Sequence, residues 1–318
     1  MFRPGERTEE ISVYTPARPP STQELQALVA RLLLVPDEHR RFTVDEQSAR
    51  RLHRVGPELL SALCEAGVPF VGTGAARLFD GYDLGNAALH LGLASVQRRA
   101  VRSWAGSLRT ASASQGPRYR VDVTASCPVP GHAGPCRYGV LLPGARRPVE
   151  AASPQETTLA RLYVRSRGHW PDFPPAVLDL LRTLEPVGFF LLPEAIRWDP
   201  EFLWSTRMAD CGGAAAWLVA EGRRRGLDVR FSFGLLVAKP YSTPHCWAEF
   251  LVGGRWVPAD PLLLRAMAAW GGLDAAAHPP HSSPGAIYHR LAGRFTKVVS
   301  HAGVWAPTSL PTELLPCL

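Results

Sequence analysis

The sequence predicts an α+β fold with a cysteine-bearing helix and an antiparallel hairpin, after a mainly helical N-terminal region. Residues 21–195 show capping boxes followed by apolar residues at helical spacing, beginning with the S-T-Q-E box at 21–24. Residues 245–260 are typical of a β-hairpin, because Gly253 and Gly254 form a two-residue turn signal between two apolar runs. An alanine-rich segment that begins with a cysteine precedes this hairpin and predicts a helix.

Composition limits the class of protein. The chain has 318 residues, enough for one large domain or two small ones. The longest apolar runs are too short to span a membrane, and the N-terminus lacks the apolar core of a secretory signal, so we expect a cytoplasmic protein with reduced cysteines. The net charge of +7 indicates a basic surface or an acidic protein partner. Neither aromatic residues interleaved with basic ones nor zinc-finger spacing supports a nucleic-acid partner.

The chain divides into three expected regions. Residues 1–20 are polar and proline-rich, which predicts a flexible arm. Residues 21–195 form the mainly helical region, which we expect to contribute to the site for substrate or partner, and 196–318 form the catalytic core with its C-terminal segment. Within the second region, periodicity predicts one long helix over 84–104, and alternation at 119–123 predicts a strand that could pair with 138–142.

One group of possible metal ligands lies between those two strands. Cys127, His132 and Cys136 could supply three ligands of a zinc site. A fourth ligand is missing nearby, and Pro128 and Gly131 are typical of an ordinary loop. A zinc site and an ordinary loop both stay open as interpretations, and of the two we expect the loop, without a metal.

The predicted hairpin places a histidine beside an aspartate. Closing the turn pairs Val252 with Arg255, and counting outwards places His245 and Asp260 on one face of the sheet as diagonal neighbours, about 7 Å apart at the backbone. Glu249 lies farther from the histidine, so Asp260 is the better orienting acid.

The cysteine lies where a helix begins. Asp210 is a typical N-cap residue, which places Cys211 in the first turn, where the free amides and the helix dipole favour a thiolate. The same amides could stabilise an oxyanion, and Gly212 and Gly213 could leave room for a substrate.

These residues together predict covalent acyl chemistry. Cys211 would attack an acyl carbon, His245 would move the proton, and Asp260 would fix the imidazole tautomer. Weaker expectations concern the surroundings: Gly212 as an oxyanion-side residue, and Trp204 and Trp247 as residues next to the substrate, although either tryptophan could belong to the core.

The motifs P-H-C-W-A-E-F (244–250) and R-W-V-P-A-D-P (255–261), with a cysteine at a helix start, resemble the transglutaminase-like superfamily within the papain-like cysteine fold. The usual pattern is H-A-W-x-E followed by G-x-W-x-x-x-D, and here Cys246 replaces the small residue after the histidine. The resemblance implies a papain/transglutaminase-like fold, in which the helix that carries Cys211 packs on an antiparallel sheet that carries His245 and Asp260. It also implies catalytic roles for these three residues, and neither a metal nor an organic cofactor.

The reaction of such a site depends on the acyl acceptor. The size and basic charge resemble those of natural-product amide-forming condensing enzymes of the lincosamide-pathway type, which take an aminoacyl group from an acidic carrier protein and pass it to an amine. The alternative is a cysteine peptidase for leader or small peptides. A protein-cross-linking transglutaminase and a binding module without activity also stay open, as do the donor, the acceptor and the oligomeric state.

Overall fold

The structure is a computed structural model that describes residues 19–113, 116–129, 131–132 and 134–316. The chain forms two compact units, residues 1–99 and 100–318. Residues 1–18 of the expected flexible arm lie outside the described residues. Among the described residues, none of the helices combines the length and the apolar character needed to cross a membrane.

The first unit consists of short helices and a small antiparallel sheet. Its strands lie in the order β1-β3-β2. The capping box at Ser21 is present, with the Ser21 hydroxyl accepting from the amide of Glu24 and the Glu24 carboxylate accepting from the amide of Ser21. The elements are α1 (Thr22–Leu32), η1 (Asp37–His39), β1 (Phe42–Val44), α2 (Glu46–Ser48), η2 (Ala49–His53), α3 (Pro57–Glu65), β2 (Phe70–Val71), η3 (Gly74–Ala76), β3 (Leu78–Asp80) and α4 (Gly81–His90).

The long helix expected over 84–104 is two helices. α4 ends at His90, and α5 (Val96–Ala113) begins after a break at Gly92, whose φ of 77° is incompatible with a continuing helix. Ser95 then accepts from the amide of Arg98. The helical spacing of apolar residues continues across this break, so periodicity alone did not predict the end of α4 and the start of α5.

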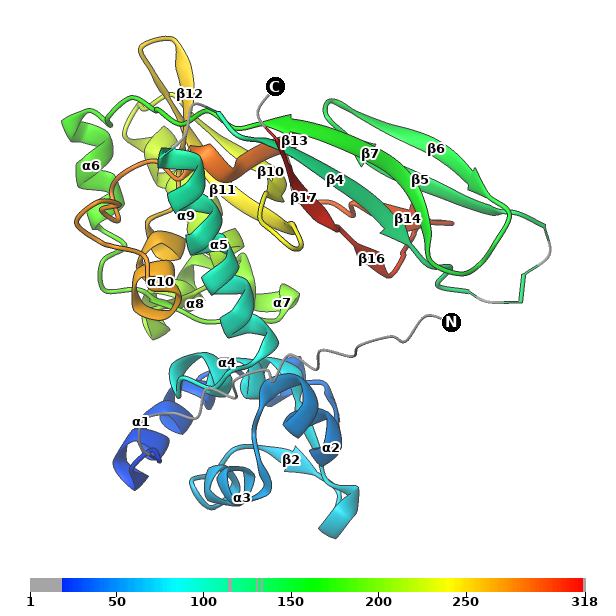
Figure 1. Cartoon of the computed structure of the whole chain (residues 1–318). Coiled ribbons are helices and arrows are strands. Elements are labelled where there is room, and N and C mark those ends of the chain that lie inside the picture. Colours follow the sequence, from blue (N-terminus) through cyan, green and yellow to red (C-terminus); the bar gives the residue numbers. More distant parts are fainter. Residues whose placement is uncertain (1–18, 114–115, 130, 133, 317–318) are drawn as a thin grey trace, which may run out of the picture. The chain divides into compact units, whose positions relative to one another are not determined.

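The centre of the second unit is the predicted helix on an antiparallel sheet. Four strands lie in the order β12-β11-β10-β13: β10 (Val229–Leu236), β11 (Thr243–Val252), β12 (Arg255–Ala259) and β13 (Tyr288–Ala292). Helix α9 (Cys211–Arg224) packs on this sheet (Figure 1), and a Cβ at Gly222 would lie 3.0 Å from Val229 and 3.4 Å from Phe250. The fold class is therefore confirmed.

The rest of the second unit contains long strands that the sequence analysis assigned to a mainly helical region. β4 (Arg118–Ala125), β5 (Cys136–Leu142), β6 (Ala145–Ala151) and β7 (Thr157–Arg165) are drawn in green in Figure 1. The expected strands at 119–123 and 138–142 both exist, but they do not pair with each other: β4 pairs with β7, and β5 pairs with β6. The mainly helical character expected for 21–195 is therefore wrong for residues 118–165, which form strands, whereas α6 (Pro175–Arg182) in the same region is helical.

Strands near the C-terminus complete these sheets. β14 pairs with β5, and both β16 and β17 pair with β4. The elements are β14 (Val299–His301), β15 (Val304–Trp305), β16 (Thr308–Ser309) and β17 (Thr312–Leu315). The remaining elements of this unit are α6 (Pro175–Arg182), β8 (Gly188–Phe189), α7 (Glu194–Arg197), α8 (Pro200–Thr206), β9 (Met208–Ala209), α10 (Pro261–Gly271) and η4 (Gly285–Ile287).

Candidate active site

The hairpin of β11 and β12 has the register that the sequence predicts. Val252 pairs with Arg255, and the pairing continues to Ala248 and Ala259. Both turn glycines have positive φ, 55° and 77°, as a type I′ turn requires. The ladder ends one residue before Asp260, which leaves its side chain free to turn toward the start of β11.

His245 and Asp260 are directly hydrogen-bonded. The Nε2 atom of His245 lies 2.7 Å from Oδ2 of Asp260, and both side chains are buried. The other carboxylate oxygen, Oδ1, accepts from the amide of Leu263, so that Asp260 is also the N-cap of α10. The helix therefore holds the carboxylate in a fixed orientation. The predicted pairing of these two residues is confirmed as geometry, while their catalytic role stays a prediction.

Cys211 is the first residue of α9, as expected from the Asp210 N-cap. Oδ1 of Asp210 accepts from the amide of Gly213 at 3.0 Å. The other carboxylate oxygen lies 2.9 Å from Nε of Arg197 as an ion pair, without the alignment of a hydrogen bond. The negative charge next to the cysteine is therefore occupied by capping and balanced by an arginine. Burial raises the pKa of Asp210, against the lowering effect of Arg197.

The two glycines after the cysteine have a role different from the one expected. A Cβ at Gly212 would lie 2.9 Å from the ring of Trp198, and a Cβ at Gly213 would lie 2.3 Å from the carbonyl oxygen of Arg197. The two glycines thus make room for the end of α7. Trp198 and the carbonyl group of Arg197 occupy the space that was expected for a substrate. The amide of Gly212 also interacts with Asp210, which leaves the amide of Cys211 as the first-turn donor that Asp210 does not engage.

The electrostatics of His245 favour its protonated form. Burial alone would lower the pKa of His245, but the hydrogen-bonded side chains of Cys211 and Asp260 outweigh it and raise the pKa to about 10. An imidazolium next to a cysteine favours the reactive thiolate. The structure thus brings Cys211, His245 and Asp260 together in the order that nucleophile, base and orienting acid require.

Tyr288 is a fourth member of this cluster, and the sequence analysis did not find it. Its hydroxyl donates to Oδ2 of Asp260 at 2.9 Å and lies 3.2 Å from Nε2 of His245. Burial raises the pKa of Tyr288 well above its usual value, and Asp260 adds to the effect, so the hydroxyl stays a donor. Gly234 permits this approach, because a Cβ there would lie 2.1 Å from the carbonyl oxygen of His289 in the neighbouring strand.

The two tryptophans that were expected near the substrate differ in position. Trp247 lies beside His245, with ring centroids 6.4 Å apart and nearly parallel planes, and its indole N–H donates to Glu249. Trp204 packs instead against Trp217 of α9 and beneath the guanidinium of Arg207. Trp247 therefore shapes the surroundings of the imidazole, whereas Trp204 belongs to the core around α9.

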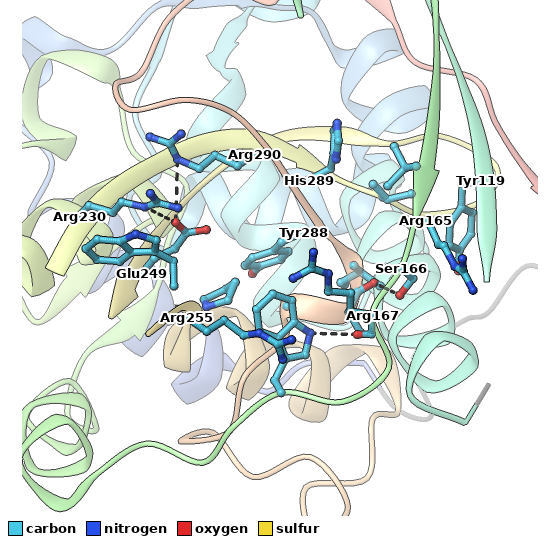
Figure 2. A pocket seen from close by; sticks show the side chains of 18 of the residues that line it. Tyr119, Arg165, Ser166, Arg167, Arg230, Glu249, Arg255, Tyr288, His289 and Arg290 are labelled. Carbon is cyan, nitrogen blue, oxygen red and sulfur yellow. Dashed lines mark hydrogen bonds and ion pairs between the residues drawn. The ribbon is translucent and has the colours of Figure 1, made fainter. Parts of the chain in front are cut away.

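A basic cavity of about 600 Å³ is lined by side chains that include Glu249 of β11 and Tyr288 of β13 (Figure 2). Residues alternate between faces along β11, so that Ala248 and Phe250 pack in the core with α9 while Glu249 faces the cavity. Tyr288 belongs both to the cavity wall and to the His245 cluster. Five arginines and one carboxylate line this cavity: Arg165, Arg167, Arg230, Arg255, Arg290 and Glu249.

Only part of this positive charge is balanced within the cavity. The Glu249 carboxylate lies 2.6 Å from Nε of Arg230 and 3.9 Å from Nε of Arg290 (Figure 2). The excess of guanidinium groups favours a ligand with negative charge. Cys211 is not among the described lining residues, and Tyr288, which lines the cavity, contacts both His245 and Asp260.

One family model and one solved structure are similar to parts of this chain. Residues 194–261, which include Cys211, His245 and Asp260, match the model of the transglutaminase-like superfamily. A crystal structure of a candidate cysteine protease from Cytophaga hutchinsonii is similar, with 12% identity, a TM-score of 0.36 and coverage of 64% of this chain and 92% of that one. The search of the curated proteins found no match. The chain thus carries a transglutaminase-like domain over its central residues.

Proposed function

We propose that this protein is a cysteine-dependent acyltransferase that forms an amide bond. It would move an acyl or aminoacyl group from a carrier-protein thioester, through a thioester on Cys211, to an amine in natural-product biosynthesis. The observation that carries this proposal is the hydrogen-bonded arrangement of Cys211, His245 and Asp260, in which the pKa of His245 is raised to about 10. A thiolate paired with an imidazolium is the attacking group of such enzymes.

The first half-reaction loads the enzyme. The Cys211 thiolate attacks the carbonyl carbon of the donor thioester, which gives an oxyanion. The backbone amide of Cys211, in the first turn of α9, would donate a hydrogen bond to that oxyanion. Collapse breaks the bond to the carrier sulfur, and His245 gives its proton to that leaving thiolate. In the second half-reaction an amine attacks the Cys211 thioester, the neutral His245 takes its proton, and the Cys211 thiolate leaves.

Burial of the base supports transfer over hydrolysis. His245, Asp260 and Trp247 each expose 6% or less of their surface, and Trp247 and Tyr288 flank the imidazole. A site that excludes water from its base limits hydrolysis of a reactive thioester. The excess of arginine in the neighbouring cavity supports an acidic donor, such as a carrier protein with its phosphate-bearing arm.

The experiment that tests the proposal compares amine and water as acceptors. The protein is incubated with acyl thioesters of a carrier protein and a panel of amines, and the products are separated by mass spectrometry. Amide formation that requires both the amine and Cys211 supports transfer. Release of free acid at a rate that amines do not change, or cleavage of peptides, would identify the protein as a hydrolase or peptidase instead.

A further inference from the structure

The structure completes the group of possible metal ligands that the sequence analysis left without a fourth member. Cys127, His132, Cys136 and His301 each offer one ligand atom, and these four atoms all lie within 4.8 Å of one another. From this geometry we propose that the second unit contains a structural zinc site of the Cys₂His₂ type. The site is independent of the proposed acyltransferase function.

Strand pairing explains how a distant residue joins the cluster. β14 pairs antiparallel with β5 so that His301 lies opposite Tyr138. Cys136 and Tyr138 are two residues apart on β5 and share a face of the sheet, and directly paired residues share that face too. His301 therefore points to the same side as Cys136. The end of β4 brings Cys127 close, since the Cys127 amide donates to the carbonyl of Pro154 beside the end of β6.

The distances fit a tetrahedral ion after small adjustments. Ligand atoms around tetrahedral zinc lie about 3.3–3.8 Å apart, given bonds of roughly 2.3 Å to sulfur and 2.0 Å to nitrogen. The Cys136 sulfur already lies 3.3 Å from Nε2 of His132. The ring centroids of His132 and His301 lie 5.0 Å apart. Closing the cluster therefore needs side-chain shifts of about 1 Å or less.

One buried nitrogen of the cluster lacks a hydrogen-bond partner among the described residues, while the Cys127 thiol donates to the carbonyl of Val129. Nδ1 of His301 is buried and has no hydrogen-bond partner among the described residues, and His301 exposes only 8% of its surface. A buried polar atom without a partner is costly, and coordination in the cluster would satisfy the imidazole. Cys127 and Cys136 are both buried free thiols. A disulfide between them would occupy the sulfurs but leave Nδ1 of His301 without a partner among the described residues.

Two thiolates and two imidazoles select zinc among common metals, because hard cations such as Mg²⁺ and Ca²⁺ prefer oxygen ligands. Four protein ligands close the coordination shell, which is typical of structural sites. The ion would join the end of β4, the start of β5 and β14. β14 belongs to the C-terminal segment that follows β13, so the site would anchor the segment directly after the strand that carries Tyr288.

Metal analysis of the purified full chain tests the proposal. We expect about one zinc per chain, reduced at least ~10-fold by Cys136→Ser or His301→Ala, since loss of one of four ligands removes most of the affinity. Cys64→Ser and His278→Ala are matched controls outside the cluster and should retain the metal. Wild-type stoichiometry in folded Cys136→Ser and His301→Ala proteins would overturn the proposal.

A second measurement covers the case in which the variants fail to fold. Zinc is removed from the wild-type chain with a chelator under reducing conditions, and Co²⁺ is added. We expect stoichiometric binding with the absorption of tetrahedral cobalt and of thiolate-to-cobalt charge transfer, and a melting temperature that falls by ~5 °C or more on metal removal. Absence of zinc together with failure to bind Co²⁺, or a Cys127–Cys136 disulfide in the peptide mass map of the protein as purified, would refute the site.

Discussion

Replacing Asp260 with asparagine separates the charge of this residue from its capping role. Oδ2 of Asp260 accepts from Nε2 of His245 and from the hydroxyl of Tyr288, while Oδ1 accepts from the amide of Leu263. An asparagine that keeps its carbonyl on Leu263 presents an NH₂ group to Nε2 of His245. Because an NH₂ group only donates, the imidazole must then carry its proton on Nδ1 and cannot accept the proton of Cys211 through that atom.

The alternative orientation of the asparagine is also unfavourable. Turning the amide so that its carbonyl faces His245 places the NH₂ group against the amide of Leu263, which removes the cap of α10 at a cost of ~1 kcal/mol. Either way the charge-assisted hydrogen bond to His245 is lost, which is worth about 1.5–3 kcal/mol. We expect acylation of Cys211 to fall by about 10³–10⁴-fold, the loss that a wrong tautomer causes in catalytic triads.

The assay follows the rate of Cys211 modification by an acyl thioester and by iodoacetamide as a function of pH. We expect Asp260→Asn to slow both reactions most near neutral pH, because the pKa of His245 falls when the carboxylate is removed. Asp122→Asn is the matched control, since Asp122 pairs with Arg161 away from the site. If Asp260→Asn and wild type react with Cys211 at rates within twofold of each other over the whole pH range, the orienting role of Asp260 is refuted.

Three further perturbations test the same cluster. Tyr288→Phe keeps the ring beside Trp247 but removes the donor to Asp260; we expect a stability loss of ~1–2 kcal/mol and a shifted pH profile of Cys211 alkylation, and an unchanged profile would argue against a positioning role. Arg197→Ala leaves the buried Asp210 charge unpaired; we expect a loss on the order of 3 kcal/mol and slower alkylation of Cys211, whereas Arg224→Ala, in an exposed ion pair, should change neither. The folded-state pKa of His245 is raised from 6.5 to about 10, so the stabilisation from its protonated form is complete below pH ~6.5 and is lost as pH rises through about 10. Relative to His245→Gln, the free energy of unfolding of wild type should therefore fall over that window by as much as ~5 kcal/mol, with a lower melting temperature at the alkaline end. A difference between the two proteins that does not change with pH would contradict the raised pKa.

The parts of the site that the sequence predicts depend on local rules. A two-residue turn fixes the register of β11 and β12, and a period of two then places His245 and Asp260 on one face. A capping aspartate fixes the first turn of α9 and hence Cys211. These features depend only on residues that are close together in the sequence.

The missed residues depend on strand pairings between distant segments. Tyr288 reaches Asp260 only because β13 pairs with β10 and passes close to Gly234. His301 joins Cys136 only because β14 pairs with β5. The sequence also suggested that Gly212 makes room for a substrate, whereas the ring of Trp198, at the end of α7, occupies that space. Long-range packing determines each of these positions, and no local pattern encodes it.

The central claim is that Cys211 forms the acyl-enzyme. Its most direct test is intact-mass spectrometry of the protein after brief exposure to an acyl thioester without amine, followed by peptide mapping. The account predicts one acyl group on Cys211 in wild type, its removal when an amine is added, and its absence from Cys211→Ala. Acylation of another cysteine, or equal acylation of wild type and Cys211→Ala, would contradict the claim.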